Sequence, residues 1–244
     1  MEMVYKKKYR VHVYETGPGG KLSLYSLFNY LQDIASDHAE TLGFGRDDLL
    51  KDNRFWVLSR MYLEINRLPL WEETVDVSTW PSGTESLFAL RNYEVSGSDG
   101  VIIRGSSSWL ILDRDSKRVQ RPDNVLSRFE FPVRDNNIRN STKLNIVGEQ
   151  AVTDHCFRIK ASDLDVNLHT NNAVYVRWIT DSYDLGYIMN NDPQSVEINY
   201  LAESRFGDEI NVRTSADKDY YDHSIIRTDD KKEICRIRIG WTKV

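Results

Sequence analysis

The residues of this sequence best suited to do chemistry together lie in one short polar run. Asp165, Asn167 and His169 alternate with apolar residues, and Asn171 and Asn172 follow after Thr170. Histidine is the usual general acid or base near neutral pH, and a carboxylate can fix its tautomer. Side-chain amides can donate hydrogen bonds to an oxygen that gains negative charge. The run therefore has groups for proton transfer and for stabilising an oxyanion.

A helix is predicted to begin where the polar run ends. Val174, Tyr175 and Trp178 are spaced as on one helical face, and Asn171 or Asn172 can cap the helix. A helix start offers free backbone N–H groups and the positive end of the helix dipole, which favour a developing oxyanion. The simpler interpretation is a polar loop with an ordinary helix cap.

The elements that must position this run occur twice along the chain. In the first half, Gly17 to Gly20 form a turn before a strongly amphipathic helix, which Gly43 closes. The first half is predicted to contain a strand at 3–14, a helix at 22–42 and strands at 56–66, 73–80, 86–96 and 101–112. The second half is predicted to contain a strand at 155–160, a helix at 172–188 and strands at 195–202, 209–214, 223–228 and 233–242.

The shared order of elements predicts a duplicated domain. A single long helix that needs one face covered, followed by antiparallel strands, is typical of the hot-dog arrangement, in which a curved sheet wraps the helix. We therefore predict an α+β, tandem double hot-dog fold. The N-terminal domain spans 1–135, a connector spans 136–150, and the C-terminal domain, with the polar run, spans 151–244. The matching part of the first half, 19–23, has neither His nor Asn, so the fold does not require these side chains.

The polar run also contains a motif of a known enzyme family. Its residues are Asn167, His169, Asn171 and Asn172, followed by Tyr175 and Trp178. This pattern resembles the active-site motif of acyl-acyl-carrier-protein thioesterases. In that family a downstream strand carries a Glu that is often followed by Cys. The corresponding residues here are Glu203 and Ser204, so the acid is kept and the thiol is replaced.

The resemblance implies hydrolysis of the thioester between a fatty acyl chain and acyl carrier protein, releasing free fatty acid in fatty acid biosynthesis. It implies no metal and no organic cofactor, and an acyl chain housed in the first half. The catalytic residues that it implies are Asp165, Asn167, His169 and Glu203. The supporting residues are Asn171, Asn172 and Ser204.

Ser204 favours attack by water over a covalent mechanism, because a serine hydroxyl is far less acidic than a thiol and needs its own activating base. Glu203 is the best candidate to take the proton of that water. His169 would orient the water or polarise the thioester carbonyl, and Asp165 would fix its tautomer. Asn167 would donate its amide hydrogens to the carbonyl or to Glu203.

The net charge and the lack of long apolar stretches limit which partners and which cellular location we expect. The net charge of −5 gives no case for nucleic-acid binding. The first residues lack the apolar stretch of a signal peptide, and no window approaches the ~20 apolar residues of a membrane helix. We therefore expect a cytoplasmic protein that does not bind membranes. The family resemblance adds the expectation of a homodimer.

A small basic cluster could bind the acidic acyl carrier protein. Lys6, Lys7 and Lys8 form this cluster, and Arg177 on the second helix is a further candidate. The simpler interpretation of the cluster is an edge strand protected by charge.

Two alternatives to the leading hypothesis stay open. The chain could be an acyl-CoA thioesterase or another hot-dog enzyme, and hydrolysis of acyl-carrier-protein and acyl-CoA substrates separates the two thioesterases. It could also be a non-catalytic module that binds acyl thioesters, for which tight binding without thiol release would be the evidence.

Overall fold

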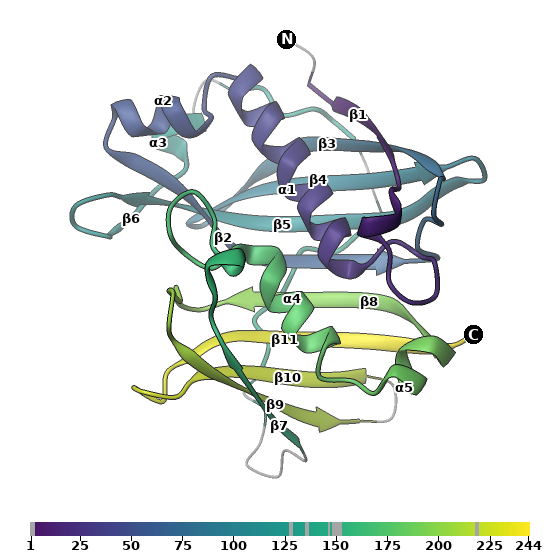
Figure 1. Cartoon of the computed structure of the whole chain (residues 1–244). Helices are drawn as coiled ribbons and strands as arrows, with labels where there is room; N and C mark the ends of the chain where they lie inside the picture. The colour runs from purple at the N-terminus through teal and green to yellow at the C-terminus, as the bar shows by residue number, and fades with distance from the viewer. Residues whose placement is uncertain (1–2, 127–128, 135–136, 146, 148–152, 218–219) are drawn as a thin grey trace.

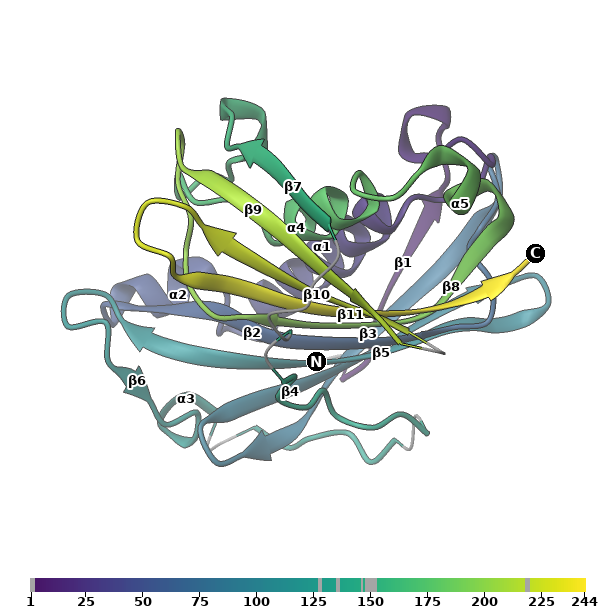
Figure 2. The same cartoon turned by 90° about the horizontal axis from the view of Figure 1, so that it is seen from below.

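The two halves of the chain join edge to edge through the strand that follows each long helix. The computed structural model describes residues 3–126, 129–134, 137–145, 147, 153–217 and 220–244. In these residues β2 (Arg54–Ile65) pairs antiparallel with β8 (Asn191–Tyr200), so that Met61 lies opposite Ile198 and Leu63 opposite Val196. This pairing makes one curved sheet of eleven strands from the described residues of both halves (Figures 1 and 2).

The strand order of the second half mirrors that of the first. The first half contributes β1 (Tyr5–Arg10), β3 (Thr74–Glu85), β4 (Phe88–Gly97), β5 (Gly100–Asp113) and the short β6 (Val119–Gln120). The second half contributes β7 (Thr153–Arg158), β9 (Glu209–Ala216), β10 (Tyr220–Arg227) and β11 (Glu233–Lys243). The order is β1-β3-β4-β5-β2-β8-β11-β10-β9-β7, with β6 paired to β5. The prediction of a tandem double hot-dog fold is confirmed.

Helix α1 (Leu24–Thr41) is the central helix of the first half. The hydroxyl of Ser23 caps it by accepting a hydrogen bond from the backbone N–H of Ser26, and Gly43 at φ +76° ends the helical path. Its buried face carries Leu24, Leu27, Phe28, Leu31, Ile34 and Ala35. These residues recur at helical spacing, as predicted, and cover the inner face of the sheet.

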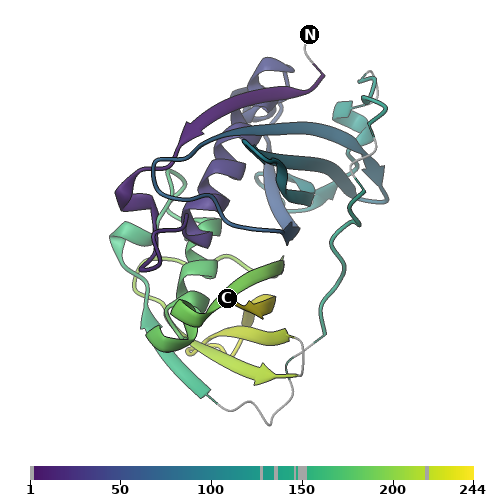
Figure 3. The same cartoon turned by 90° about the vertical axis from the view of Figure 1, so that its right-hand side faces the viewer.

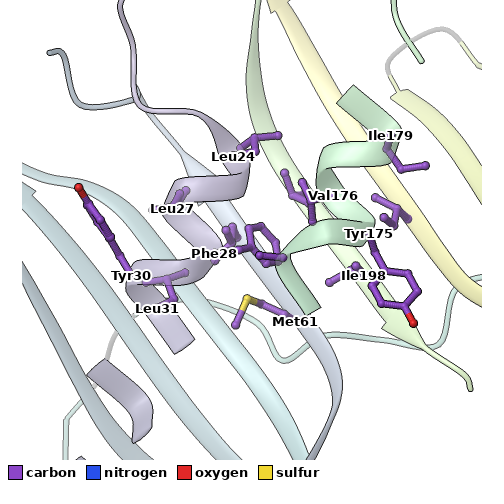
Figure 4. Packing of buried hydrophobic residues seen from close by; sticks show 14 of the residues in the cluster. Leu24, Leu27, Phe28, Tyr30, Leu31, Met61, Tyr175, Val176, Ile179 and Ile198 are labelled. Atoms are coloured by element: carbon purple, nitrogen blue, oxygen red, sulfur yellow. The ribbon is translucent and has the colours of Figure 1, made fainter. Parts of the chain in front are cut away.

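Helix α4 (Asn172–Thr180) lies beside α1 on the same face of the sheet. Figure 4 shows Phe28 of α1 and Val176 of α4 between the two helices, with Met61 and Ile198 of the sheet close to them. The inner core is therefore continuous across the junction of the two halves.

The prediction of one helix over 172–188 is wrong. The chain leaves α4 at Asp181 and forms a separate, exposed helix α5 (Leu185–Asn190). Thr180 and Ser182 donate their hydroxyl groups to the carbonyls of Arg177 and Ile179, at 2.9 and 2.7 Å, and such bonds compete with helix continuation. Tyr183 then packs against Trp241 with ring centroids 5.2 Å apart, which anchors the break.

Two short α-helices, α2 (Arg46–Lys51) and α3 (Asp123–Leu126), and two 3-10 helices, η1 (Val13–Glu15) and η2 (Ala161–Asp163), complete the described chain. No helix in the described part of the chain is long and apolar enough to cross a membrane. The predicted domain boundaries at 135/136 and 150/151 fall outside the described residues.

The described part of the predicted connector crosses the outer face of the sheet, opposite the helices (Figure 3). The guanidinium of Arg139 donates two hydrogen bonds, of 2.9 and 2.7 Å, to the carboxylate of Glu197, which is nearly inaccessible to solvent. The backbone N–H of Thr142 donates to the same carboxylate at 2.6 Å, and the backbone N–H of Leu144 donates to Asn199 at 2.8 Å. The connector is therefore fastened to β8, the strand at the junction.

Candidate active site

The loop before α4 is shaped by one carboxylate. Asp165 accepts hydrogen bonds from the backbone N–H groups of Asn167 and His169, at 2.8 and 3.2 Å. Leu168 lies in the left-handed region, at φ +62°, which the turn requires. The side-chain amide of Asn167 donates to Asp165 at 3.4 Å. Asp165 thus holds the backbone of the loop, whereas the sequence predicted that it would bind the ring of His169.

The imidazole of His169 faces the carboxylate of Glu203. Its Nε2 atom lies 3.3 Å from Oε2 of Glu203, and the two side chains are 29% and 42% exposed. The loop reaches this position because the backbone N–H of Thr170 donates to the carbonyl of Ser204 at 3.0 Å, and because His169 forms a β-bridge with Arg205. A short backbone pairing therefore places an acid and a base together at a solvent-accessible edge.

Ser204 is fully buried beside this pair. Its hydroxyl donates to Oγ1 of Thr170 at 2.8 Å and lies 2.8 Å from the hydroxyl of Tyr175. Since Ser204 uses its proton on Thr170, Tyr175 must be the donor in the second contact. Burial raises the pKa of Tyr175, which keeps the phenol protonated for this role. The position of the family's cysteine is thus occupied by a hydroxyl that ties α4 to the segment after β8.

The backbone of Glu203 is held by Arg227, the last residue of β10. Arg227 donates to the carbonyl oxygen of Glu203 at 3.1 Å. The same guanidinium binds Asp230 at 2.6 Å and Asp208 at 3.5 Å, so it is fixed in place. Arg205 brings a second cation within 3.9 Å of the Glu203 carboxylate. The role of Arg227 was not predicted, because nothing local in the sequence connects it to Glu203.

The two asparagines that follow His169 anchor α4. Asn171 caps the helix by accepting a hydrogen bond from the backbone N–H of Ala173 at 2.9 Å. The side-chain amide of Asn172 donates to the side chain of Gln32 on α1 at 3.5 Å, and the backbone carbonyl of Asn172 accepts a hydrogen bond from the hydroxyl of Tyr200 at 3.0 Å. Both residues therefore hold the active-site loop against the rest of the fold, in keeping with a supporting role.

A cavity of about 1090 Å³ connects this site to the first half. One end is lined by residues 165–172 and 200–203, which include all four predicted catalytic side chains. The remainder runs beneath α1 and α2, where most of the lining is apolar: Ala35, Ala39, Phe44, Leu50, Trp56, Leu58, Ala89, Trp109 and Leu126. Such a cavity suits a long apolar ligand whose polar end reaches His169 and Glu203.

The predicted docking residues lie apart from this cavity, and two of them are already paired. Lys7 binds Asp33 at 2.6 Å and Asp37 at 2.8 Å, and the hydrogen bonds to these carboxylates raise the pKa of Lys7. Lys6 and Lys8 are exposed on β1, at the outer edge of the sheet. Arg177 pairs with the buried carboxylate of Asp163, and its guanidinium lies over the ring of Tyr25.

Within the described residues, no group of three or more His, Cys, Asp or Glu side chains is arranged to hold a metal ion.

Comparison with protein families gives two matches that together cover most of the chain. The model of the acyl-ACP thioesterase N-terminal domain matches residues 2–129, and that of the acyl-ACP thioesterase C-terminal domain matches residues 147–243.

Among curated proteins, the chain is similar to plant enzymes. It is 26% identical over 235 residues to the oleoyl-acyl carrier protein thioesterase of Coriandrum sativum, and the match covers 88% of this chain and 63% of that protein. It is 26% identical over 263 residues to the palmitoyl-acyl carrier protein thioesterase of Gossypium hirsutum, and this match covers 98% of this chain and 64% of that protein. Both relatives are described as chloroplastic. The chain thus spans a little under two thirds of the length of these relatives.

Among solved structures, an acyl-ACP thioesterase from Bacteroides thetaiotaomicron superposes with a TM-score of 0.90 at 24% identity, covering 98% of each chain. The 12:0-ACP thioesterase from Umbellularia californica superposes with a TM-score of 0.85 at 23% identity, covering 100% of this chain and 99% of that one. At these identities the likeness establishes the shared fold.

Proposed function

The chain belongs to the acyl-ACP thioesterase family, and from this premise we propose that it hydrolyses the thioester between a fatty acyl chain and acyl carrier protein. The observation that supports the proposal most directly is the 3.3 Å approach of His169 to Glu203 at the polar end of the cavity. The apolar part of the cavity would hold the acyl chain, and the thioester would lie beside the two polar side chains.

The reaction would begin with attack by water. Glu203 accepts a proton from the water as its oxygen bonds to the carbonyl carbon of the thioester, and the carbonyl oxygen gains the negative charge. The amide of Asn167 and the positive end of the α4 dipole stabilise that oxyanion. His169, whose Nε2 atom lies 3.3 Å from the Glu203 carboxylate, orients the water.

The tetrahedral intermediate then loses its sulfur. The carbonyl re-forms, the carbon–sulfur bond breaks, and the proton held by Glu203 passes to the departing sulfur. The products are the free fatty acid and the thiol of the carrier, which together contain all the atoms of the thioester and the water. Glu203 returns to its carboxylate form, so the site is ready for another substrate.

The buried position of Ser204 supports this order of events. Its hydroxyl is engaged by Thr170 and Tyr175, and the described residues place no carboxylate or imidazole in contact with it that could remove its proton. Ser204 therefore supports the site, and Asp165 acts by fixing the loop through the backbone of Asn167 and His169.

A thiol-release assay tests the proposed function. The purified chain is incubated with acyl-carrier-protein thioesters of graded acyl length, and free thiol is measured with a chromogenic disulfide. We expect release from at least one chain length, and loss of that release with His169→Ala. Equal or faster hydrolysis of acyl-CoA would make the chain an acyl-CoA thioesterase. Binding of every acyl thioester without thiol release would make it a non-catalytic module.

Two further expectations remain predictions, namely a cytoplasmic location and a homodimer. Light scattering during size-exclusion chromatography tests the homodimer, and fractionation of the source cells tests the location.

A further inference from the structure

A second groove, of about 730 Å³, adjoins the catalytic pair on its outer side. We propose that this groove binds the phosphodiester of the phosphopantetheine arm by which acyl carrier protein presents its acyl chain, and that Lys117 and Lys232 are the cations that contact it. The proposal rests on the proposed function, because the arm is present only on such a substrate. It assigns carrier recognition to residues outside the basic cluster at the N-terminus.

The groove is continuous with the catalytic cavity. Leu112, Lys117 and Leu201 to Glu203 line both spaces, so a ligand can extend from one into the other. A thioester at Glu203 would direct its acyl chain into the large cavity and its thiol-bearing arm towards the groove. The phosphodiester lies at the far end of that arm, and the groove therefore lies in the direction that the phosphodiester must take.

The lining of the groove is positively charged although the chain as a whole carries a net charge of −5. Four cations, namely Lys117, Arg205, Arg227 and Lys232, line it with only two carboxylates, Glu203 and Asp208. A wall of this composition attracts a phosphodiester, which carries one negative charge and strong acceptor oxygens.

Two of the four cations have no carboxylate partner for their charged group. Arg227 is committed to Asp208, Asp230 and the carbonyl of Glu203, and Arg205, whose side chain is 69% exposed, lies 3.9 Å from the Glu203 carboxylate at the catalytic end of the groove. Both Lys117 and Lys232 are exposed. The backbone N–H of Lys232 donates to Asp230 at 3.1 Å, but neither ammonium group forms an ion pair with a carboxylate among the described residues. An unpaired lysine is a suitable point charge for a phosphate oxygen.

Both lysines are held at the groove by local structure. Lys117 lies in the turn between β5 and β6, and its ammonium group lies 5.0 Å from the centre of the Phe55 ring. Lys232 lies in the β10–β11 turn, where its carbonyl accepts from the backbone N–H of Arg227 at 2.9 Å. Figures 1 and 2 show both turns at the end of the sheet where the loop before α4 lies.

Exposed apolar residues occur close to the proposed catalytic residues in the chain and suit the uncharged part of the arm and the surface of its carrier. Val166 and Leu168 flank Asn167, and Leu201 and Phe206 lie within three residues of Glu203; they range from 41% to 85% exposed, and Leu201 lines the groove itself. Exposed apolar side chains beside unpaired cations are typical of a surface that binds an acidic partner. The basic cluster on β1 lacks this setting, because Lys7 is paired twice and β1 is the outermost strand.

The test compares two substrates that differ only in the phosphate: an acyl-4′-phosphopantetheine and the matching acyl-pantetheine. The wild-type chain should hydrolyse the phosphorylated substrate with a kcat/KM higher by roughly tenfold, mainly through a lower KM. Lys117→Glu combined with Lys232→Glu should remove this preference and raise the KM for acyl carrier protein thioester by at least as much. Lys117→Gln with Lys232→Gln serves as the milder pair if charge reversal disturbs folding.

The matched control is Lys143→Glu with Lys243→Glu, which changes the net charge equally at two exposed positions away from the groove. This control should keep the preference for phosphate. The proposal is overturned if the groove variants keep the wild-type ratio of the two kcat/KM values. It is also overturned if the control variant loses the preference for phosphate to the same extent, or if Lys6→Glu with Lys8→Glu removes that preference instead. Failure of the wild-type chain to release thiol from either substrate would contradict the proposed function, whereas normal hydrolysis with an unchanged ratio would contradict only the groove.

Discussion

His169 and Glu203 meet at 3.3 Å although they come from different parts of the second half, one before α4 and one after β8. The contact depends on the backbone pairing of Thr170 with Ser204 and on the hold of Arg227 on the Glu203 carbonyl. The chemistry proposed for the site therefore depends on a few backbone hydrogen bonds that bring two loops together.

Glu203→Gln should lower kcat by about 10²–10⁴-fold and change KM little, because the amide keeps the shape of the side chain but cannot accept the proton of water. Steady-state thiol release measures both constants. Glu209→Gln, which changes an exposed carboxylate at the start of β9, is the matched control and should behave as the wild type. Wild-type turnover by Glu203→Gln would show that another group is the base.

Ser204→Ala should lower the free energy of unfolding by about 1–3 kcal/mol, because it leaves the buried hydroxyls of Tyr175 and Thr170 short of a partner. Turnover should fall far less than in Glu203→Gln. Urea denaturation and thiol release measure the two effects, and Tyr175→Phe should destabilise the same cluster. An acyl group found on Ser204 by mass spectrometry during turnover would instead establish a covalent route.

Stability should decline in mild acid because of His223. Burial lowers the pKa of His223 to about 3 from its usual value near 6.5, and its ring nitrogens are engaged by Tyr183 and Thr214. Between these values the unfolded chain binds a proton that the folded chain does not. The contribution of His223 is therefore fully present above about pH 6.5 and falls by about 1.4 kcal/mol per pH unit below it.

Urea denaturation of the wild type and of His223→Gln at pH 7.5, 6 and 5 isolates this contribution, since other titrating groups are common to both chains. The stability advantage of the wild type should shrink as the pH falls. A constant difference across the three pH values would mean that His223 is protonated to the same extent in the folded and unfolded chains.

Glu197→Ala should release the connector from the outer face of the sheet. Removing this nearly inaccessible carboxylate leaves Arg139 and the N–H of Thr142 without their acceptor. Because the Arg139 side chain is 46% exposed and can be solvated, the expected cost is that of lost hydrogen bonds, about 1–3 kcal/mol. Limited proteolysis should then cut the connector faster than in the wild type, with Glu209→Ala, an exposed position at the start of β9, as control. Equal cleavage rates would contradict the fastening role of Glu197.

Local patterns were sufficient to predict the elements and part of the site. Apolar residues at helical spacing, with Ser23 before them and Gly43 after them, predicted α1, because a helix is built from contacts three and four residues apart. Asp165, Asn167 and His169 were found together because they are neighbours in the chain, and one turn keeps them close. The repeated order of elements predicted the double hot-dog fold, because each element can be recognised from its own local pattern and the order is read directly along the chain.

Contacts between distant segments decided the rest. The end of α4 at Thr180 depends on Tyr183 packing against Trp241, which helical periodicity cannot reveal. Ser204 stands beside Glu203 in the sequence, yet the fold buries its hydroxyl against Tyr175 while the carboxylate of Glu203 stays exposed to His169. Lys117 and Lys232 belong to different halves, and only the pairing of β2 with β8 brings their turns to one groove. The sequence thus determined which groups are present and in which elements, and the tertiary structure decided which of them meet, because each such meeting depends on contacts between residues far apart in the chain.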